Sequence, residues 1–331
     1  MTQIMTTKIR RTISTLLLSF LYSIAVAGTI PETSVKINSE QVINLGHSFR
    51  IGTDDASSQI EVNVYLPDSY HNQTSSQQTS DNNATIDKAK AKHYPVLYVI
   101  DGGLQQDFKH IAGLGSLASI NPYIFEELIV VGIATQNRLF ELTSMNIDKR
   151  YDRPAGDVGG ADQFRAKIRH IVQPFIDQRY RTSSKKLVVG ESLAGLFISE
   201  TLLKTPDLFT DYIAVSPSLW YDDRQLAKQA PKLLEKHSDN AISLYLTMAN
   251  EGGTMQKGLD EFLEAIQDSG LDNLKTQYID RRNNEFHWTI YHDAVLDALR
   301  WILAVPEPDY ANDEDPWYLI EGANPPNWKN E

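Results

Sequence analysis

The sequence contains no cysteine, and this absence excludes three kinds of chemistry. Disulfide bridges, thiolate metal sites and lipid attachment to a cysteine all require a thiol. Such a protein must be stabilised by its hydrophobic core alone. A chain of 331 residues is long enough for one large domain.

Positive charge is scarce as well, since 31 Lys and Arg residues face 43 Asp and Glu residues and the formal net charge is -12. An acidic surface repels phosphate backbones, which argues against nucleic acid as a partner. The sequence also lacks the His-Glu-x-x-His zinc motif, the phosphate-loop lysine motif and Gly-x-Gly-x-x-Gly. We therefore expect neither a metal ion nor an organic cofactor.

The first 27 residues have the pattern of an export signal. A basic segment, 1–11, precedes the apolar segment 12–26, and Ala25-Val26-Ala27 matches the A-x-A cleavage site. The alternative is a membrane anchor, but the apolar segment is shorter than the roughly 20 residues that a spanning helix needs. We expect cleavage after Ala27, a mature periplasmic or secreted chain that begins at Gly28, and no stable membrane insertion.

After this signal, short apolar segments rich in β-branched residues alternate with amphipathic helical patterns. This order predicts an α/β fold, with a mostly parallel central sheet and helices on both of its faces. The predicted strands are 60–67, 94–100, 128–135, 185–190, 211–216, 242–248 and 274–280, and the predicted helices are 161–180, 192–205, 259–270 and 291–303.

The predicted catalytic domain spans residues 28–305 and contains two unusual segments. Residues 71–93 are polar and poor in aromatics, which indicates a solvated insertion. Residues 136–160 form a long connection after a strand, which could supply one wall of a site. Beyond this domain, residues 306–331 are predicted to form a proline-rich acidic tail. Its cluster Asp313–Asp315 is interpreted as a solvated loop, because the spacing fits no EF-hand calcium loop.

Ser192 lies in "VVGESLAGLF", between a predicted strand and a predicted helix. It could simply cap the helix, or it could be a nucleophile exposed at a tight strand-to-helix turn. The small residues Gly190, Ala194 and Gly195 relieve the crowding that such a turn creates. Alanine at the second position after the serine departs from Gly-x-Ser-x-Gly, so the motif alone is only moderately specific.

A nucleophilic serine needs a base and an acid, which follow it in the order serine, acid, histidine on this fold. His287 follows the last predicted strand and is a better base than His292, which falls inside the closing helix. Glu251 directly follows the strand 242–248, and we favour it as the acid. Its competitors are Asp260, Glu261 and Asp280, and a dyad without a close acid also remains open.

Two backbone N–H groups should stabilise the oxyanion of the tetrahedral intermediate. One belongs to Leu193, the residue after the nucleophile. The other belongs to Gly102 or Gly103, which follow the strand 94–100. Glycines at a strand exit are also common turn residues and need no catalytic reason.

Several phrases together resemble the esterase branch of the α/β-hydrolases, which includes periplasmic siderophore esterases and esterase D-like enzymes. They are "YPVLYVIDGG", "VVGIATQNRLFELT", "GESLAGLF", "FTDYIAVSPSLWYDD" and "NEFHWTIYHDAVLDALRWI". The resemblance implies a serine hydrolase that cleaves small-molecule esters, with Ser192 as nucleophile and His287 as base. It is consistent with Glu251 as the acid, although members differ in how the acid is supplied.

We therefore expect ester hydrolysis through an acyl-enzyme, with an acyltransferase or a non-catalytic binding protein of the same fold as alternatives. Trp220 and Tyr221 are candidate walls of the substrate pocket, and Arg138 and Arg150 are candidate partners of an anionic substrate. These features suggest a catecholate siderophore ester or another anionic aryl ester. Packing roles for the rings and ion pairs for the arginines are the competing interpretation. The sequence does not indicate an oligomeric state.

Overall fold

The computed structural model describes residues 39–52, 59–75, 91–151, 153–154, 156–235 and 239–306. By its contacts the chain divides into Met1–Ile43 and Asn44–Glu331, and the fold belongs to the second unit. The predicted signal peptide, most of the predicted polar insertion and nearly all of the predicted tail lie outside the described residues, as do Asp313–Asp315.

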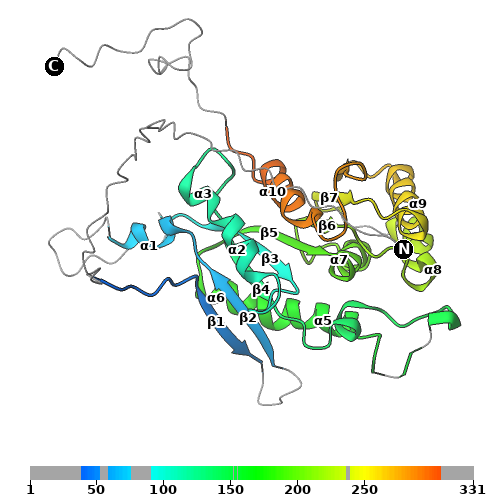
Figure 1. Cartoon of the computed structure of the whole chain (residues 1–331), viewed down its shortest axis with the longest axis horizontal. Helices are drawn as coiled ribbons and strands as arrows, with labels where there is room; N and C mark the ends of the chain where they lie inside the picture. Colours follow the sequence, from blue (N-terminus) through cyan, green and yellow to red (C-terminus); the bar gives the residue numbers. More distant parts are fainter. Residues whose placement is uncertain are drawn as a thin grey trace, which may run out of the picture. The chain divides into compact units, whose positions relative to one another are not determined.

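An eight-stranded sheet forms the centre of this unit, in the order β1-β2-β4-β3-β5-β6-β7-β8 (Figure 1). β1 and β2 pair antiparallel, as do β2 and β4, whereas all the other neighbours are parallel. The strands are β1 (His47–Ile51), β2 (Ile60–Tyr65), β3 (Tyr94–Ile100), β4 (Ile129–Ile133), β5 (Thr182–Glu191), β6 (Asp211–Val215), β7 (Ile242–Met248) and β8 (Leu274–Asp280).

The sheet confirms the predicted α/β fold, and each of the seven predicted strands is present. The sequence did not reveal β1, a short edge strand whose residues are partly or largely exposed. Exposed edge strands lack the apolar run or the strict alternation by which a strand is recognised.

The helices are more numerous than predicted. They are α1 (Asp68–Ser75), α2 (Phe108–Gly115), α3 (Leu117–Ile120), α4 (Arg138–Leu142), α5 (Ala161–Lys167), α6 (Gln173–Arg179), α7 (Leu193–Lys204), α8 (Tyr221–Leu234), α9 (Gly253–Ser269) and α10 (Ile290–Ile302), with a 3-10 turn at Lys149–Tyr151 and a π-helical turn at Ile168–Val172. The predicted helix 161–180 is thus α5 and α6 joined by the π turn. The first five residues of the predicted polar insertion belong to α1.

Two hydrophobic cores cover the two faces of the sheet. Every residue of β3 is buried, and successive side chains contribute to opposite cores, as the two-residue period of a strand requires. The core on one face includes residues of α5 to α9, and the core on the other includes residues of α2, α3 and α10 (Figure 1). This layering leaves the loops at the carboxyl ends of the parallel strands free to form a site.

No helix among the described residues is both long and apolar enough to cross a bilayer.

Candidate active site

Ser192 lies at the turn between β5 and α7 in a strained backbone conformation. Its φ is 59° and its ψ is -114°, a region that residues with a side chain rarely occupy. A methyl group on Gly190 would come within 2.6 Å of the Ala194 Cβ, and one on Gly195 would come within 3.0 Å of the Val215 carbonyl oxygen. The tight packing of this turn therefore requires both glycines that flank Ser192.

The segment after β6 contacts Ser192 directly. The N–H of Ser218 donates to the Ser192 carbonyl oxygen at 3.0 Å, and the hydroxyl oxygens of these two serines lie 3.3 Å apart. Among the described residues, no hydrogen bond joins the Ser192 hydroxyl to His287. The Ser192 side chain is thus partnered by a second serine.

Glu251 and His287 form the central pair of the site. The Nδ1 atom of His287 lies 2.7 Å from the Oε1 atom of Glu251, whose carboxylate is 7% exposed. This hydrogen bond raises the pKa of His287, while partial burial of the ring opposes the rise. Because Nδ1 donates to Glu251, the tautomer leaves Nε2 unprotonated and able to accept a proton.

The competing acids have other partners. Asp280 accepts hydrogen bonds from Arg282, Asp260 accepts one from Gln256, and Glu261 accepts two from Arg224. His292, the less favoured base, contacts His110 instead: its Nε2 atom lies 3.0 Å from the Nδ1 atom of that residue.

Backbone hydrogen bonds join the loop that carries Glu251 to the loop that carries His287. The N–H of Asn250 donates to the Glu285 carbonyl at 2.8 Å, and the N–H of Arg281 donates to the Met248 carbonyl at 3.1 Å. We call these two bonds the acid–base clasp. Gly252 and Gly253 follow with φ values of 61° and 53°, so glycine permits the turn that starts α9 after Glu251.

The candidate oxyanion donors differ in their present partners. Leu193 is the first residue of α7, so its N–H has no helical carbonyl to which it can donate. The N–H of Gly103 donates to the side-chain oxygen of Gln106 at 2.9 Å, a partner that a substrate could displace. The N–H of Gly102 donates to the Ile133 carbonyl at 2.8 Å, and its Cα packs against Gly132. The geometry therefore favours Leu193 with Gly103 and gives Gly102 a structural reason to be glycine.

Both candidate arginines are already in ion pairs. The Nε atom of Arg138 donates to Asp101 at 2.6 Å, and the Nε atom of Arg150 donates to Asp148 at 2.9 Å, with Asp223 also close to Arg150. The competing interpretation, in which the arginines form ion pairs, thus agrees with the contacts.

Trp220 and Tyr221 form an aromatic cluster with Tyr151, with ring centroids 6.0 to 6.3 Å apart. The Tyr221 hydroxyl donates to Asn146 at 2.7 Å. Its ring also lines a small cavity of about 100 Å³ together with Leu196 of α7 and Met145. These contacts hold the segment 144–151 against the start of α8.

Sequence reasoning did not single out three residues of the site. Phe286 and Trp288, on either side of His287, are 48% and 80% exposed, and their rings stack with centroids 5.3 Å apart and planes 6° apart. The third is Glu191, the residue before Ser192. Burial raises the pKa of Glu191 to about 7, and its charge interacts with His287 and Glu251. Ser192 follows β5, Glu251 follows β7 and His287 follows β8, so the carboxyl ends of these parallel strands place all three at one edge of the sheet. The aromatic residues on either side of His287 were visible in the sequence, but their exposure and the surroundings of Glu191 were not.

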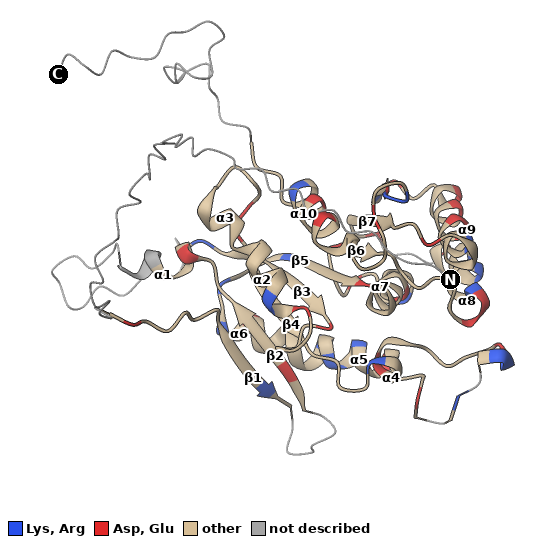
Figure 2. Ribbon diagram, in the orientation of Figure 1, with Lys and Arg blue, Asp and Glu red and all other residues tan. Residues whose placement is uncertain are grey.

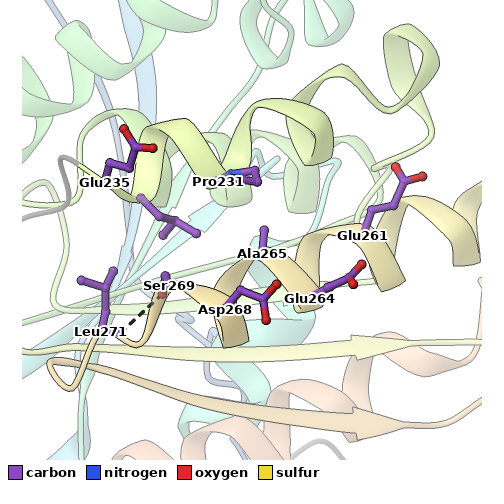
Figure 3. A pocket seen from close by; sticks show the side chains of 9 residues that line it. Pro231, Glu235, Glu261, Glu264, Ala265, Asp268, Ser269 and Leu271 are labelled. Carbon is purple, nitrogen blue, oxygen red and sulfur yellow. Dashed lines mark hydrogen bonds between the residues drawn. The ribbon is translucent and has the colours of Figure 1, made fainter.

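A larger cavity lies elsewhere, between α8 and α9 (Figure 3). It measures about 500 Å³, and its lining includes Glu235, Glu261, Glu264 and Asp268 around an apolar floor of Pro231, Leu234, Ala265 and Leu271. Acidic residues follow one another along α9 (Figure 2). Glu261, one of the competing acids, lines this cavity, whereas Ser192, Glu251 and His287 do not.

Comparisons with known proteins agree with the fold. The family model described as "Putative esterase" matches residues 54–302. The ferri-bacillibactin esterase BesA of Bacillus subtilis is 25% identical over 230 residues, which are 63% of this chain and 79% of that protein.

Among solved structures, the BES protein from Bacillus cereus aligns with a TM-score of 0.64 at 20% identity, covering 82% of this chain and 100% of that one. The siderophore hydrolase EstB from Aspergillus nidulans aligns with a TM-score of 0.63 at 20% identity, covering 82% and 99%. At these identities, the structural matches establish the fold alone.

Proposed function

The chain belongs to the Putative esterase family, and on that premise we propose that it is a serine hydrolase that acts through an acyl-enzyme. As a member of this family it is a carboxylic ester hydrolase that acts on small-molecule esters. The proposal adds the residues: Ser192 as nucleophile, His287 as general base and Glu251 as the acid that orients the base.

One observation carries the assignment, namely the 2.7 Å hydrogen bond between His287 and the buried carboxylate of Glu251. It joins two loops that are 36 positions apart in the sequence, at the sheet edge where Ser192 has its strained backbone. A carboxylate that fixes the tautomer of a histidine, at the same sheet edge as a serine in a strained turn, is what nucleophilic catalysis needs.

In the proposed reaction, Ser192 Oγ attacks the ester carbonyl while His287 Nε2 accepts the hydroxyl proton. The N–H groups of Leu193 and Gly103 stabilise the resulting oxyanion, and each such donor is worth roughly 3 kcal/mol in known cases. Collapse of the intermediate breaks the bond to the alkoxy group, which leaves as an alcohol with the proton from His287. Water, deprotonated by the same histidine, then releases the acid and restores Ser192.

We propose a siderophore ester or another aryl ester as the substrate. A relative that is named as a siderophore esterase supports the class. The exposed rings of Phe286 and Trp288 beside His287 offer a flat apolar surface for an aromatic group. The ion pairs of Arg138 and Arg150 give no support to a preference for anionic over neutral esters.

We also propose that the chain is exported, that the signal is cleaved after Ala27, and that the catalytic domain spans 28–305 with a surface tail beyond it. The basic, apolar and A-x-A segments of residues 1–27 support this. Terminal sequencing of the exported protein should give Gly28 first. A retained basic N-terminus would contradict export by this signal.

Covalent labelling tests the catalytic assignment directly. Diisopropyl fluorophosphate should block hydrolysis of p-nitrophenyl acetate and add one diisopropylphosphoryl group, with loss of fluoride, to the peptide that contains Ser192, because an activated serine attacks its phosphorus. Labelling of another serine would overturn the assignment. Product analysis with added alcohol separates hydrolysis from acyl transfer, since a transferase would form the new ester.

A further inference from the structure

Asn63 places a fully buried side-chain amide in the middle of β2. Asparagine is uncommon inside strands, where β-branched and aromatic residues are preferred. Its Nδ2 atom donates two hydrogen bonds of 3.0 Å, one to the Gly102 carbonyl oxygen and one to the Glu61 carboxylate. Its Oδ1 atom is buried, and no hydrogen bond reaches it from the described part of the chain. A buried oxygen without a donor lowers the stability of the fold, so stability alone does not explain an asparagine here.

The bond to Gly102 reaches across the strand that lies between the two residues. Asn63 pairs in register with Gly132 of β4, and β4 lies between β2 and β3, the strand that leads to Gly102. A methyl group on Gly132 would come within 2.2 Å of the Gly102 carbonyl oxygen. Glycine at position 132 therefore leaves the space that this carbonyl group occupies, and the amide of Asn63 holds the carbonyl in that space.

The orientation of the Gly102 carbonyl also sets that of the Gly103 N–H, because both groups belong to one peptide bond. No peptide bond of the described residues is cis, and in a trans peptide the carbonyl and the N–H point in opposite directions. The N–H of Gly103 therefore points away from Asn63, and it donates to Gln106 at 2.9 Å. A hydrogen bond accepted by the carbonyl also polarises the peptide, which makes the N–H a stronger donor.

We propose that Asn63 is a positioning residue for ester hydrolysis, which acts through the peptide bond between Gly102 and Gly103. It fixes the direction of the Gly103 N–H before a substrate binds and strengthens that N–H as an oxyanion donor. This inference rests on the proposed function, in which the Gly103 N–H stabilises the oxyanion that forms when Ser192 attacks. It goes beyond that function by assigning a role to a buried residue that touches neither the substrate nor the nucleophile.

The test compares the wild type with Asn63→Leu, which keeps the approximate size of the side chain and removes the donor, on p-nitrophenyl butyrate. We expect kcat to fall about tenfold or more while KM stays within about twofold, because an oxyanion donor acts mainly in the transition state. A trifluoromethyl ketone, which forms an oxyanion when a nucleophilic serine adds to its carbonyl, should bind more weakly by a similar factor.

The matched control is Gln173→Leu, at a second buried amide. The Nε2 atom of Gln173 donates to the Leu208 carbonyl at 2.9 Å, so this variant also removes a buried bond between an amide and a backbone carbonyl. It should lower the melting temperature and leave both kcat and the affinity for the ketone unchanged.

Three results would overturn the proposal. The first is an unchanged kcat in Asn63→Leu, and the second is a lower kcat with unchanged affinity for the ketone. The third is an equal loss of kcat in Gln173→Leu, which would mean that reduced stability alone explains the effect. If Asn63→Leu does not fold, Asn63→Ala decides by the same measurements. Failure of the proposed function is distinguishable, because Ser192→Ala would then still hydrolyse the ester.

Discussion

The two ends of the sheet differ, because strained backbone conformations lie at the carboxyl end and a cavity lies at the amino end. At the carboxyl end, Asp101, Ser192 and Ser216 each follow a strand with a positive φ, at 59°, 59° and 40°. Such conformations cost on the order of 1–3 kcal/mol each. At the amino end of the parallel strands, α8 and α9 border the cavity of about 500 Å³, and no residue that lines it has a positive φ.

The carboxylates at the two ends of the sheet also differ in their burial and in their partners. The carboxylate of Glu251 is buried and hydrogen-bonded to a histidine, and the partly buried Glu191 has one buried oxygen without a partner among the described residues. Around the cavity, Glu261 forms an ion pair with Arg224, and Glu264 lies one helical turn from both Asp260 and Asp268 on α9. Cavity volume therefore identifies the candidate active site less well than backbone strain and the partners of buried charges do. Substitutions at the two ends of the sheet test this, because only those at the carboxyl end should change activity.

The Ser192→Ala variant should give the largest effect at the carboxyl end. We expect hydrolysis of an activated aryl ester to fall by at least roughly a thousandfold, because the attacking oxygen is lost. The hydroxyl makes one side-chain contact, with Ser218, so the melting temperature should change little. Equal activity in the variant and the wild type would contradict the proposal that Ser192 is the nucleophile of a serine hydrolase.

The Glu251→Gln variant should lower kcat by about a hundredfold or more, because the amide no longer holds the imidazolium that forms during attack. The hydrogen bond that His287 donates to Glu251 raises the pKa of His287, so its loss should move the acid limb of the kcat/KM profile to lower pH. Asp260→Asn and Asp280→Asn are the matched controls and should not shift the acid limb of the kcat/KM profile. A shift of the acid limb in Asp260→Asn, without one in Glu251→Gln, would identify Asp260 as the acid.

The Trp288→Ala variant tests the apolar surface of the same end. We expect KM for an aryl ester to rise several-fold, with kcat nearly constant, because the ring contributes binding area and no chemistry. An acetate ester of a small alcohol should be unaffected. Ile120→Ala, which removes another exposed apolar side chain, is the control. An equal effect on both esters would give Trp288 a structural role.

The smallest effect is expected at the cavity. Glu264→Gln should leave kcat/KM within about twofold on every ester, because surface charges far from the reaction contribute little. Like charges one turn apart on α9 repel, so the variant should melt about 1 °C higher. A large loss of activity would show that the cavity belongs to the functional site and would contradict the functional difference between the two ends of the sheet.

The strands of the parallel part were predictable because their residues form apolar runs bounded by turn residues, as in β3 and β7. α8 escaped prediction for local reasons. It contains Pro231, and Asp222, Asp223 and Arg224 near its start have left-handed backbone angles. Its position is fixed by tertiary contacts instead, since the buried Asp222 accepts hydrogen bonds from the N–H groups of Ile147 and Asp148.

For the site, chain order was enough to select Ser192, Glu251 and His287 as candidates, and the structure brings the last two into contact. Their catalytic roles stay predictions. The surroundings of Glu191 could not be predicted, because the charged groups that affect its pKa, among them Asp107, Glu251 and His287, lie far from it in the sequence. The hydrogen bonds that distinguish Gly102 from Gly103 are likewise non-local.

The acid–base clasp makes the ends of β7 and β8 one unit of local unfolding. β8 is the outermost strand on its side of the sheet, and most of its residues are partly or fully exposed, so it should open at a lower free energy than the buried strands. When its end opens, the bonds at Asn250 and Arg281 break together, and Glu251 and His287 separate in the same event. Ser192, anchored at the end of the buried part of β5, would remain in place. The amide protons of Asn250 and Arg281 should therefore exchange with solvent at one common rate, and that rate sets how often the resting enzyme loses its acid and base.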